Sequence, residues 1–311
     1  SLHVVRECQS LTSSSRVRVF IVDDSVIHRN RSKAVELLAR VHDHVTGRFV
    51  RGYSMLTLGW SDGSSFIPID FSLLSSAKAE NRLCGMQDSI DKRTHGFKRR
   101  QEALLQKPAA VECLITKALA AGFQADFVLM DSWFTQAPLL RVLTSMGQKV
   151  IGMVKPLKQR YLYEGQSFRL PELYRFIRVK KHKDILGSII VTTACGLPIK
   201  LVFVRNRNKR REWLAIASTD TTLDEAEIVR IYGIRWKIET FFKCTKSYLK
   251  LGTEFQGRSF DMLISHTTIV FARYLLLEWE QRKANDVRSI GGLFYVCCDE
   301  IKDIDLKTAL Q

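Results

Sequence analysis

The chain has 311 residues, with 48 Lys and Arg against 32 Asp and Glu, and a formal net charge of +16. Its 46% hydrophobic and 10% aromatic residues can bury a sizeable core, which excludes an intrinsically disordered chain, and its 17 Gly and 6 Pro are too few for collagen-like or low-complexity material. The longest apolar stretch, residues 267–279, is interrupted by Arg273 and Glu278 and is too short to span a bilayer.

The positive charge indicates which class of molecule the protein binds, and the scattered cysteines indicate its cellular compartment. An excess of 16 positive groups attracts a polyanion, and nucleic acid is the most common one. The 7 cysteines are odd in number and include no C-x-x-C pair, which is typical of reduced thiols rather than of a disulfide scaffold or a zinc ribbon. We therefore expect a soluble, cytoplasmic protein that binds nucleic acid and has no membrane segment.

Three strands are predicted before the first convincing long helix. Residues 16–24 form a run of β-branched and aromatic side chains that is apolar on both faces, as in a strand at the middle of a sheet, and the run ends in Asp23 and Asp24. Residues 50–60 and 65–74 predict two further strands, which are joined by a hairpin turn.

After a basic surface connection and a helix that begins at Pro108, the pattern alternates between strand and helix. Residues 126–131 predict a short buried strand that again ends in a carboxylate, Asp131. A helix over residues 136–146 and a strand over residues 150–154 follow. Three strands followed by βα crossovers favour an α/β fold with a ribonuclease-H-like core.

The rest of the chain divides into a β-rich part and a helical part. Short strands, turns and dense basic runs predict a β-rich insertion, and from residue 223 the pattern is helical, with one long helix to about residue 251. The predicted domains are a first part of the core over residues 1–155, the insertion over residues 156–222, a core helix over residues 223–258 and a helical C-terminal part over residues 259–311.

The long helix carries four polar residues beside its buried face. At about 100° per residue, Tyr232, Arg235, Glu239 and Lys246 fall within an arc of roughly 60°. The apolar residues of the same helix cluster about a quarter-turn away. A carboxylate at the edge of a core, with an arginine one turn before it and a lysine two turns after it, suits a cleft that binds an anion and a metal together.

Three carboxylates stand at the ends of predicted strands or on this helix: Asp24, Asp131 and Glu239. Carboxylates that converge repel each other unless cations lie between them, and sites made only of oxygen ligands favour magnesium or manganese. Two such ions about 3.5 to 4 Å apart can activate an attacking oxygen and stabilise the leaving one. The pattern predicts metal-dependent phosphoryl transfer of the nuclease type. Asp23 is the alternative first ligand, because neighbouring residues of a strand point to opposite faces.

The spacing of Tyr232, Arg235, Glu239 and Lys246 is Tyr-x2-Arg-x3-Glu-x6-Lys, which resembles the signature of DDE transposases of bacterial insertion sequences, in the insertion sequence four branch. The segments FIVDDSVI, FVLMDSWFT and IYGIRWKIETFFK also resemble this family. The resemblance covers the chain from about residue 17 to the C-terminus.

The resemblance implies two magnesium ions, replaceable by manganese, held by Asp24, Asp131 and Glu239. The family pattern of Asp followed by Ser or Thr favours Asp24, which precedes Ser25, over Asp23. It also implies hydrolysis at transposon ends and attack of the freed 3′ hydroxyl on target DNA, carried out by a homodimer in a synaptic complex.

Contacts to double-stranded DNA, both transposon end and target, are implied as well. Three signature residues match positions that hold the DNA phosphate beside the cut, and a Trp of the insertion matches one that stacks on a flipped base while a hairpin intermediate forms. The basic runs over residues 178–183 and 205–211 are predicted to face DNA. The predicted DNA-binding residues are Tyr232, Arg235, Lys246, Trp213, Lys209 and Arg210.

Two other functions remain open from the sequence. A nuclease on the same fold would cut DNA without joining it, and a non-catalytic derivative of a transposase would keep only the basic, DNA-binding surface. The intact carboxylates argue against the second. Members of this branch carry a helical DNA-recognition domain ahead of the first catalytic strand, and because only about 16 residues precede that strand here, we expect this domain to be missing.

Overall fold

A computed structural model of the chain describes residues 1–303, apart from residues 12, 14, 88, 180–182, 207, 208, 210, 211, 254 and 285–287 and the side chains of residues 299–303. Within this part of the chain, eleven strands form one mixed sheet in the order β2-β3-β1-β5-β6-β11-β10-β9-β7-β8, with β4 paired to β3. The strands are β1 (Val19–His28), β2 (Ala39–Asp43), β3 (Arg48–Ser61), β4 (Phe66–Leu74), β5 (Phe127–Met130), β6 (Val150–Val154), β7 (Arg160–Tyr163), β8 (Gln166–Arg169), β9 (Ile185–Thr193), β10 (Pro198–Arg205) and β11 (Trp213–Ser218).

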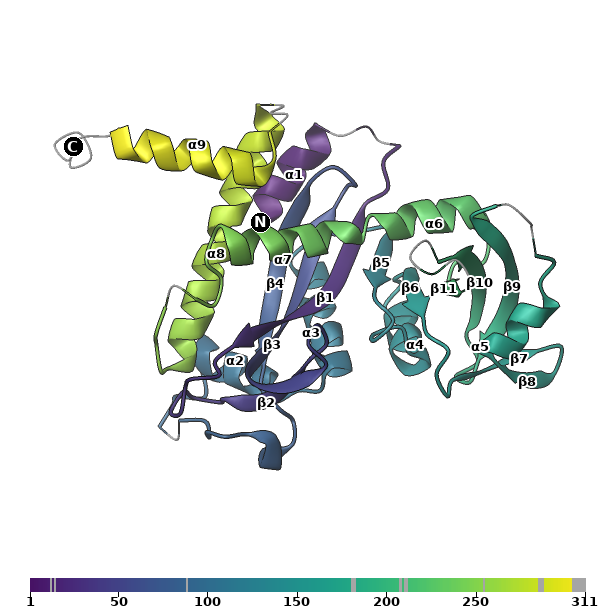
Figure 1. Ribbon diagram of the computed structural model, residues 1–311, viewed down its shortest axis with the longest axis horizontal. Helices are drawn as coiled ribbons and strands as arrows, with labels where there is room; N and C mark the ends of the chain where they lie inside the picture. Colours follow the sequence, from purple (N-terminus) through teal and green to yellow (C-terminus); the bar gives the residue numbers. More distant parts are fainter. Residues whose placement is uncertain are drawn as a thin grey trace.

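Helices cover both faces of the central strands (Figure 1). They are α1 (Leu2–Ser10), α2 (His95–Ala103), α3 (Lys107–Ala120), α4 (Ala137–Ser145), α5 (Leu170–Leu173), α6 (Glu225–Gly233), α7 (Trp236–Ser247), α8 (Phe260–Lys283) and α9 (Ile290–Asp303), with short 3₁₀ turns η1 (Ala79–Asn81) and η2 (Tyr174–Phe176). This mixed architecture with one large sheet confirms the predicted α/β class.

The central strands β1 and β5 are buried on both faces, and each face packs against a different set of helices. On one face Phe20 and Val128 pack with residues of α1, α3 and α4. On the other face Ile21 and Leu129 pack with residues of α6, α7 and α8. Since side chains alternate along a strand, the even-numbered residues of β1 belong to the first layer and the odd-numbered residues to the second.

The strands after β6 continue the same sheet. β11 pairs antiparallel with β6, so that Ala215 lies opposite Val154, and β10, β9, β7 and β8 follow outward from β11. These strands and α5 enclose an apolar cluster of their own that includes Tyr161, Leu201 and Phe203. Figure 1 shows this β-rich extension at the right, with α6 lying across it and leading back to α7.

The first strand extends farther than the sequence pattern indicated. The pattern ended the strand at Asp24, whereas β1 pairs with β3 through to His28, which lies opposite Gly52. Asp23 and Asp24 therefore lie inside a fully paired strand rather than at its end. Such a position requires cationic neighbours for both carboxylates.

The predicted long helix over residues 223–251 is interrupted near its middle. α6 ends at Gly233 and α7 begins at Trp236. Between them the chain tightens into 3₁₀-type bonds, in which Ile234 N donates to Ile231 O at 3.0 Å and Arg235 N donates to Tyr232 O at 3.0 Å. Glycine is a weak former of helix interiors, which favours a break at this point.

α8 is the one described helix that length and composition alone would allow to cross a membrane. Its inward side chains, among them Leu263, Val270 and Phe271, lie in the same core cluster as α7. Glu278 is buried on this side and accepts hydrogen bonds from Tyr274 Oη at 3.0 Å and from a backbone N–H of β4 at 3.1 Å. In this fold α8 packs as a core helix.

Candidate active site

Two carboxylates meet on the face of the sheet that α6 and α7 cover. The parallel pairing of β1 and β5 sets Val22 beside Met130, so Asp23 and Asp131 follow at the same level on neighbouring strands. In both strands the odd-numbered side chains point to one face, where Ile21 and Leu129 pack against α6, α7 and α8. Asp23 and Asp131 are odd-numbered too, so they point to the same face. The sheet itself therefore brings these two acids together.

Arg235 connects the pair to α7. Its Nη1 donates to Asp23 Oδ2 at 2.9 Å, its Nη2 donates to Glu239, and its guanidinium carbon lies 5.8 Å from the centre of the Tyr232 ring. The Arg235 side chain is 13% exposed and that of Asp23 is 16% exposed. One partly desolvated guanidinium thus links a carboxylate of the sheet to a carboxylate of the helix.

The ionised form of Asp23 is poorly solvated. Burial is the main cause that raises the pKa of Asp23 to about 7; Arg235 opposes the rise and the nearby Asp131 adds to it. A buried carboxylate beside another carboxylate has a strong preference for a proton or a cation. Asp23 therefore needs a positive partner to remain charged, and Arg235 is that partner in this structure.

Asp131 shapes the turn that leads from β5 toward α4. Its Oδ1 accepts a hydrogen bond from Trp133 N at 2.8 Å, and its carbonyl accepts one from the Thr135 hydroxyl at 2.7 Å. Gly152 on the neighbouring strand β6 makes room for this turn, because a Cβ atom there would lie 2.2 Å from the Thr135 hydroxyl oxygen. The turn fixes Asp131 relative to the end of its strand.

Asp24 belongs to the opposite face. Its Oδ2 accepts hydrogen bonds from the Ser54 hydroxyl at 2.6 Å and from Lys107 Nζ at 2.8 Å, and its side chain is 7% exposed. The sequence favoured Asp24 over Asp23 as the first ligand. In the structure Asp23 lies near enough to Asp131 and Arg235 for both to act on its pKa, whereas Asp24 bonds to Ser54 and Lys107. The pleat of β1 is the physical reason, since it turns neighbouring side chains to opposite faces.

The other two signature residues also face β1. Lys246 Nζ donates to the Ser25 hydroxyl at 2.6 Å and to the Val26 carbonyl at 3.3 Å, and burial lowers the pKa of this lysine. Tyr232 is buried under Arg235, and burial raises the pKa of its phenol to about 12. The four signature residues therefore lie along one strand, with the arginine at Asp23 and the lysine two residues farther on.

The carboxylates of Asp23, Asp131 and Glu239 are suitable ligands for a divalent cation, but the three do not converge on one point in this structure. Among the described residues, no three His, Cys, Asp or Glu side chains lie close enough together to hold a metal ion. Arg235 accounts for this, since its guanidinium lies between Asp23 and Glu239. The poorly solvated Asp23 beside Asp131 supplies the oxygen ligands and the negative charge that magnesium prefers. These two residues could hold an ion, and Glu239 could join them if its bond to Arg235 opened.

The insertion residues predicted to contact DNA have other neighbours in the structure. Trp213 begins β11, is half-buried and stacks on Tyr174, with ring centres 5.0 Å apart and planes 14° apart. Lys209 is exposed and pairs with Glu212 at 3.0 Å. Arg210 lies outside the described residues. The Trp213 ring is thus part of the apolar cluster of the extension.

Three further side chains, which bond to Asp24 or closely follow Asp131 or Arg235 in the chain, were not singled out from the sequence. Lys107 neutralises Asp24, and its Nζ lies 4.9 Å from the centre of the Trp133 ring, which is 41% exposed. Trp236, which follows Arg235, is 65% exposed. Trp133 lies two residues after Asp131, and Trp236 lies one residue after Arg235. This closeness in the sequence could have indicated both tryptophans.

The chain matches two models of protein families. Residues 2–171 match the model described as DDE superfamily endonuclease, and residues 106–276 match the model described as transposase DDE domain. Each match covers more than half of the chain, and the two overlap across β5, which leads to Asp131.

Among solved structures, the chain is similar to the piggyBac transposase in a synaptic complex with hairpin DNA. The TM-score is 0.48 at 14% sequence identity, and the similarity covers 94% of this chain and 55% of that chain. This chain thus spans about half the length of that protein. A comparison with curated proteins gives no match.

Proposed function

Because the chain belongs to the DDE superfamily of endonucleases and transposases, we propose that it is a metal-dependent DNA transposase, which cleaves transposon ends and joins the freed 3′ hydroxyl to target DNA. One observation carries the proposal. Asp23 from β1, Asp131 after β5, Arg235 directly before α7 and Glu239 on α7 gather on one face of the sheet.

The proposed metal ligands are Asp23, Asp131 and Glu239, holding two ions of magnesium or manganese. When bound, these ions would activate the attacking oxygen and stabilise the leaving one. Arg235 favours the charged form of Asp23 and holds Glu239 nearby before metal binds, because its guanidinium bonds to both. Assigning Asp23 in place of Asp24 is supported by the face of β1 on which each side chain lies.

Asp24 has a positioning role in this proposal. Its bonds to Ser54 of β3 and to Lys107 at the start of α3 tie the middle of β1 to both neighbours. The ammonium of Lys107 compensates its charge, so Asp24 has no need of a metal ion. Asp24 is therefore a matched control for Asp23, with the same chemistry one residue away.

The finer parts of the proposal come from the resemblance to the insertion sequence four branch. They are a ribonuclease-H-like core, contact of Tyr232 and Lys246 with the DNA phosphate beside the cut, and a homodimer at synapsis. A cytoplasmic location is proposed from the pattern of the cysteines.

Nicking of supercoiled plasmid by the full chain tests the catalytic assignment. In magnesium or manganese we expect the wild type to nick DNA, and we expect Asp23→Asn, Asp131→Asn and Glu239→Gln each to slow nicking by about 100-fold or more, as for loss of a group that stabilises transition-state charge. Asp24→Asn should keep most of the activity. Thermal unfolding of each variant in EDTA checks that the loss is not one of folding.

Each outcome separates two readings. Loss of nicking in Asp24→Asn but not in Asp23→Asn would reverse the ligand assignment. A wild type that binds DNA but cuts none in either metal would refute the catalytic proposal and favour a binding-only derivative. Joining is scored separately, with a pre-cut DNA end that carries a 3′ hydroxyl and a target plasmid; nicking without joining would make the protein a nuclease.

A further inference from the structure

The active-site face of β1 continues beyond Asp23 to a basic cavity. Asp23, Ser25 and Ile27 alternate on the face that α7 covers, since Ser25 bonds to Lys246 and Ile27 lies in the core cluster of α7. Arg29 is next in this row, and its backbone N–H donates to Arg51 O at 2.7 Å, so the pairing of the strands persists to this point. At about 3.3 Å per residue, Arg29 lies roughly 20 Å from Asp23.

The cavity lies between two connecting segments. Residues 28–35 continue from the last residue of β1, and residues 252–258 lie between α7 and α8. Together these segments enclose about 790 Å³. The described lining residues include four cations and no carboxylate; Glu254, which stands between the lining residues Thr253 and Phe255 in the chain, lies outside the description. The cations are Arg29, Arg31, Lys33 and Arg258.

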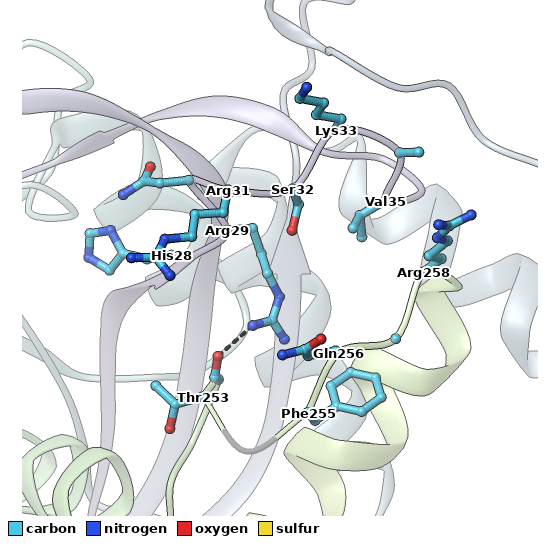
Figure 2. A pocket seen from close by; sticks show the side chains of 14 residues that line it. His28, Arg29, Arg31, Ser32, Lys33, Val35, Thr253, Phe255, Gln256 and Arg258 are labelled. Atoms are coloured by element: carbon cyan, nitrogen blue, oxygen red, sulfur yellow. Dashed lines mark hydrogen bonds between the residues drawn. The ribbon is translucent and has the colours of Figure 1, made fainter.

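Arg29 lies at the centre of this cavity. Figure 2 shows its side chain pointing from the end of β1 into the space between the two segments, toward Gln256 and Phe255. Its Nη1 donates to Gly252 O at 2.5 Å, and the guanidinium carbon lies 5.8 Å from the centre of the Phe255 ring. Gly252 has a φ of +78°, a conformation that suits glycine and presents this carbonyl to the arginine.

The other terminal nitrogen of Arg29 lacks a partner. Nη2 is buried and has no hydrogen-bond partner among the described residues. Burial also lowers the pKa of this guanidinium, because its charged form is incompletely solvated. A buried donor on a charged group costs free energy when it is left unsatisfied. Nη2 is covered in this structure, so an anion has to displace the covering groups to reach it, and a charge-assisted bond would then remove that cost.

We propose that this cavity binds a phosphodiester group of the DNA backbone, several nucleotides away from the bond that is cut. The inference rests on the proposed function, because it takes the DNA bound at Asp23 to continue along the same face of β1. Lys246 lies between the two places, and Arg31, Lys33 and Arg258 provide exposed cations around Arg29. With about 3.4 Å of rise per nucleotide, roughly 20 Å corresponds to about six nucleotides of duplex.

The test is the salt dependence of DNA binding by the full chain, with Arg31→Gln/Lys33→Gln as the variant. Both side chains are exposed, so their loss leaves the Arg29 bond to Gly252 intact. The control is Arg6→Gln/Arg141→Gln, which removes the same charge from exposed positions on α1 and α4, the helices of the opposite face. Binding is followed by fluorescence anisotropy with a duplex of about 20 base pairs, in EDTA.

We expect the slope of log K against log salt to fall by about 1 to 2 in Arg31→Gln/Lys33→Gln, since each lost phosphate contact changes it by about 0.9. The control should keep the wild-type slope. Equal slopes in the variant and the wild type, or the same loss in the control, would overturn the proposal. A second arm tests small anions: stabilisation of the wild type by ATP or inorganic phosphate, abolished by the variant, with DNA slopes unchanged, would assign the cavity to a free phosphate and overturn the DNA assignment.

The nicking assay keeps the two proposals apart. If the wild type nicks DNA but Arg31→Gln/Lys33→Gln keeps the wild-type slope of log K against log salt, only the proposal of a phosphodiester-binding cavity is refuted. A wild type that neither binds nor nicks DNA refutes both. Because Arg29 joins the two segments, Arg29→Lys serves as a further variant: it keeps the charge but loses the buried Nη2, and we expect weaker DNA binding without loss of folding.

Discussion

Replacing Arg100 with Met should lower the free energy of unfolding by more than any single substitution of an exposed residue near it. Arg100 lies in α2 and is fully buried, and its guanidinium bonds to Glu36 at 2.6 and 2.9 Å and to Asp261 at 2.8 and 2.9 Å. It thereby joins α2, the connection after β1 and the start of α8. Met has a similar length, so the change removes the charge and the donors and leaves little void.

The two carboxylates that lose this partner differ in exposure, and that difference sets the size of the effect. The Glu36 side chain is 9% exposed, so without Arg100 it is a nearly buried charge, and breaking such a pair from one side costs about 3 to 5 kcal/mol. The Asp261 side chain is 61% exposed and its bond is screened by water, which limits its share to about 1 kcal/mol. The free energy of unfolding should therefore fall by about 3 to 5 kcal/mol in Arg100→Met and by less than about 1 kcal/mol in Asp261→Asn.

Urea unfolding, followed by tryptophan fluorescence and by circular dichroism, measures both values. The comparison is valid if fluorescence and circular dichroism give the same unfolding transition, and if the free energy of unfolding falls with urea at the same slope in each variant. An Asp261→Asn variant as unstable as Arg100→Met would show that exposure does not set the cost. An Arg100→Met variant within about 1 kcal/mol of the wild type would refute the account of Glu36 as a buried charge that depends on this arginine.

Two further predictions concern the core. Burial raises the pKa of Glu278, so ionisation of this residue costs stability: its contribution is fully present below the ordinary pKa of a glutamate and is lost as the pH rises through the raised value. Glu278→Gln should therefore gain stability relative to the wild type as the pH rises above the ordinary pKa of a glutamate, and a difference in the free energy of unfolding that stays constant with pH would contradict this. Trp213→Ala should lower the stability of the extension by about 2 to 3 kcal/mol, because the ring stacks on Tyr174. An unchanged urea midpoint with a selective loss of DNA cleavage would instead support base stacking by Trp213.

The sequence pattern singled out Asp131, Glu239 and Arg235 from their motifs, and the structure joins Arg235 to Glu239 and to Asp23. The pattern could not decide between Asp23 and Asp24 from the residues. β1 is apolar on both faces, so alternation separates the two acids without saying which face receives α7. The face that each acid occupies depends on how α7 packs on β1, which is a long-range property.

The sequence patterns also failed to predict three short elements, α1, β2 and α2, and the break between α6 and α7. α1, β2 and α2 have between five and nine residues each, too few for a periodic pattern to stand out. The break between α6 and α7 was hidden because Ile234 continues the apolar period of the helix. Arg29 gave no signal either, since its role arises where residues 28–35 meet residues 252–258.

The pairing of β11 with β6 has a mechanical consequence. Because the backbone bonds of the sheet run without a gap from the extension through β6 to β5, the extension acts as a stiff lever and cannot swing independently of the core. Removing residues 156–222 would leave β6 with a bare edge of unpaired N–H and C=O groups, which invites aggregation. A force applied by any molecule held on the extension would reach the strand beside Asp131 through only one intervening strand.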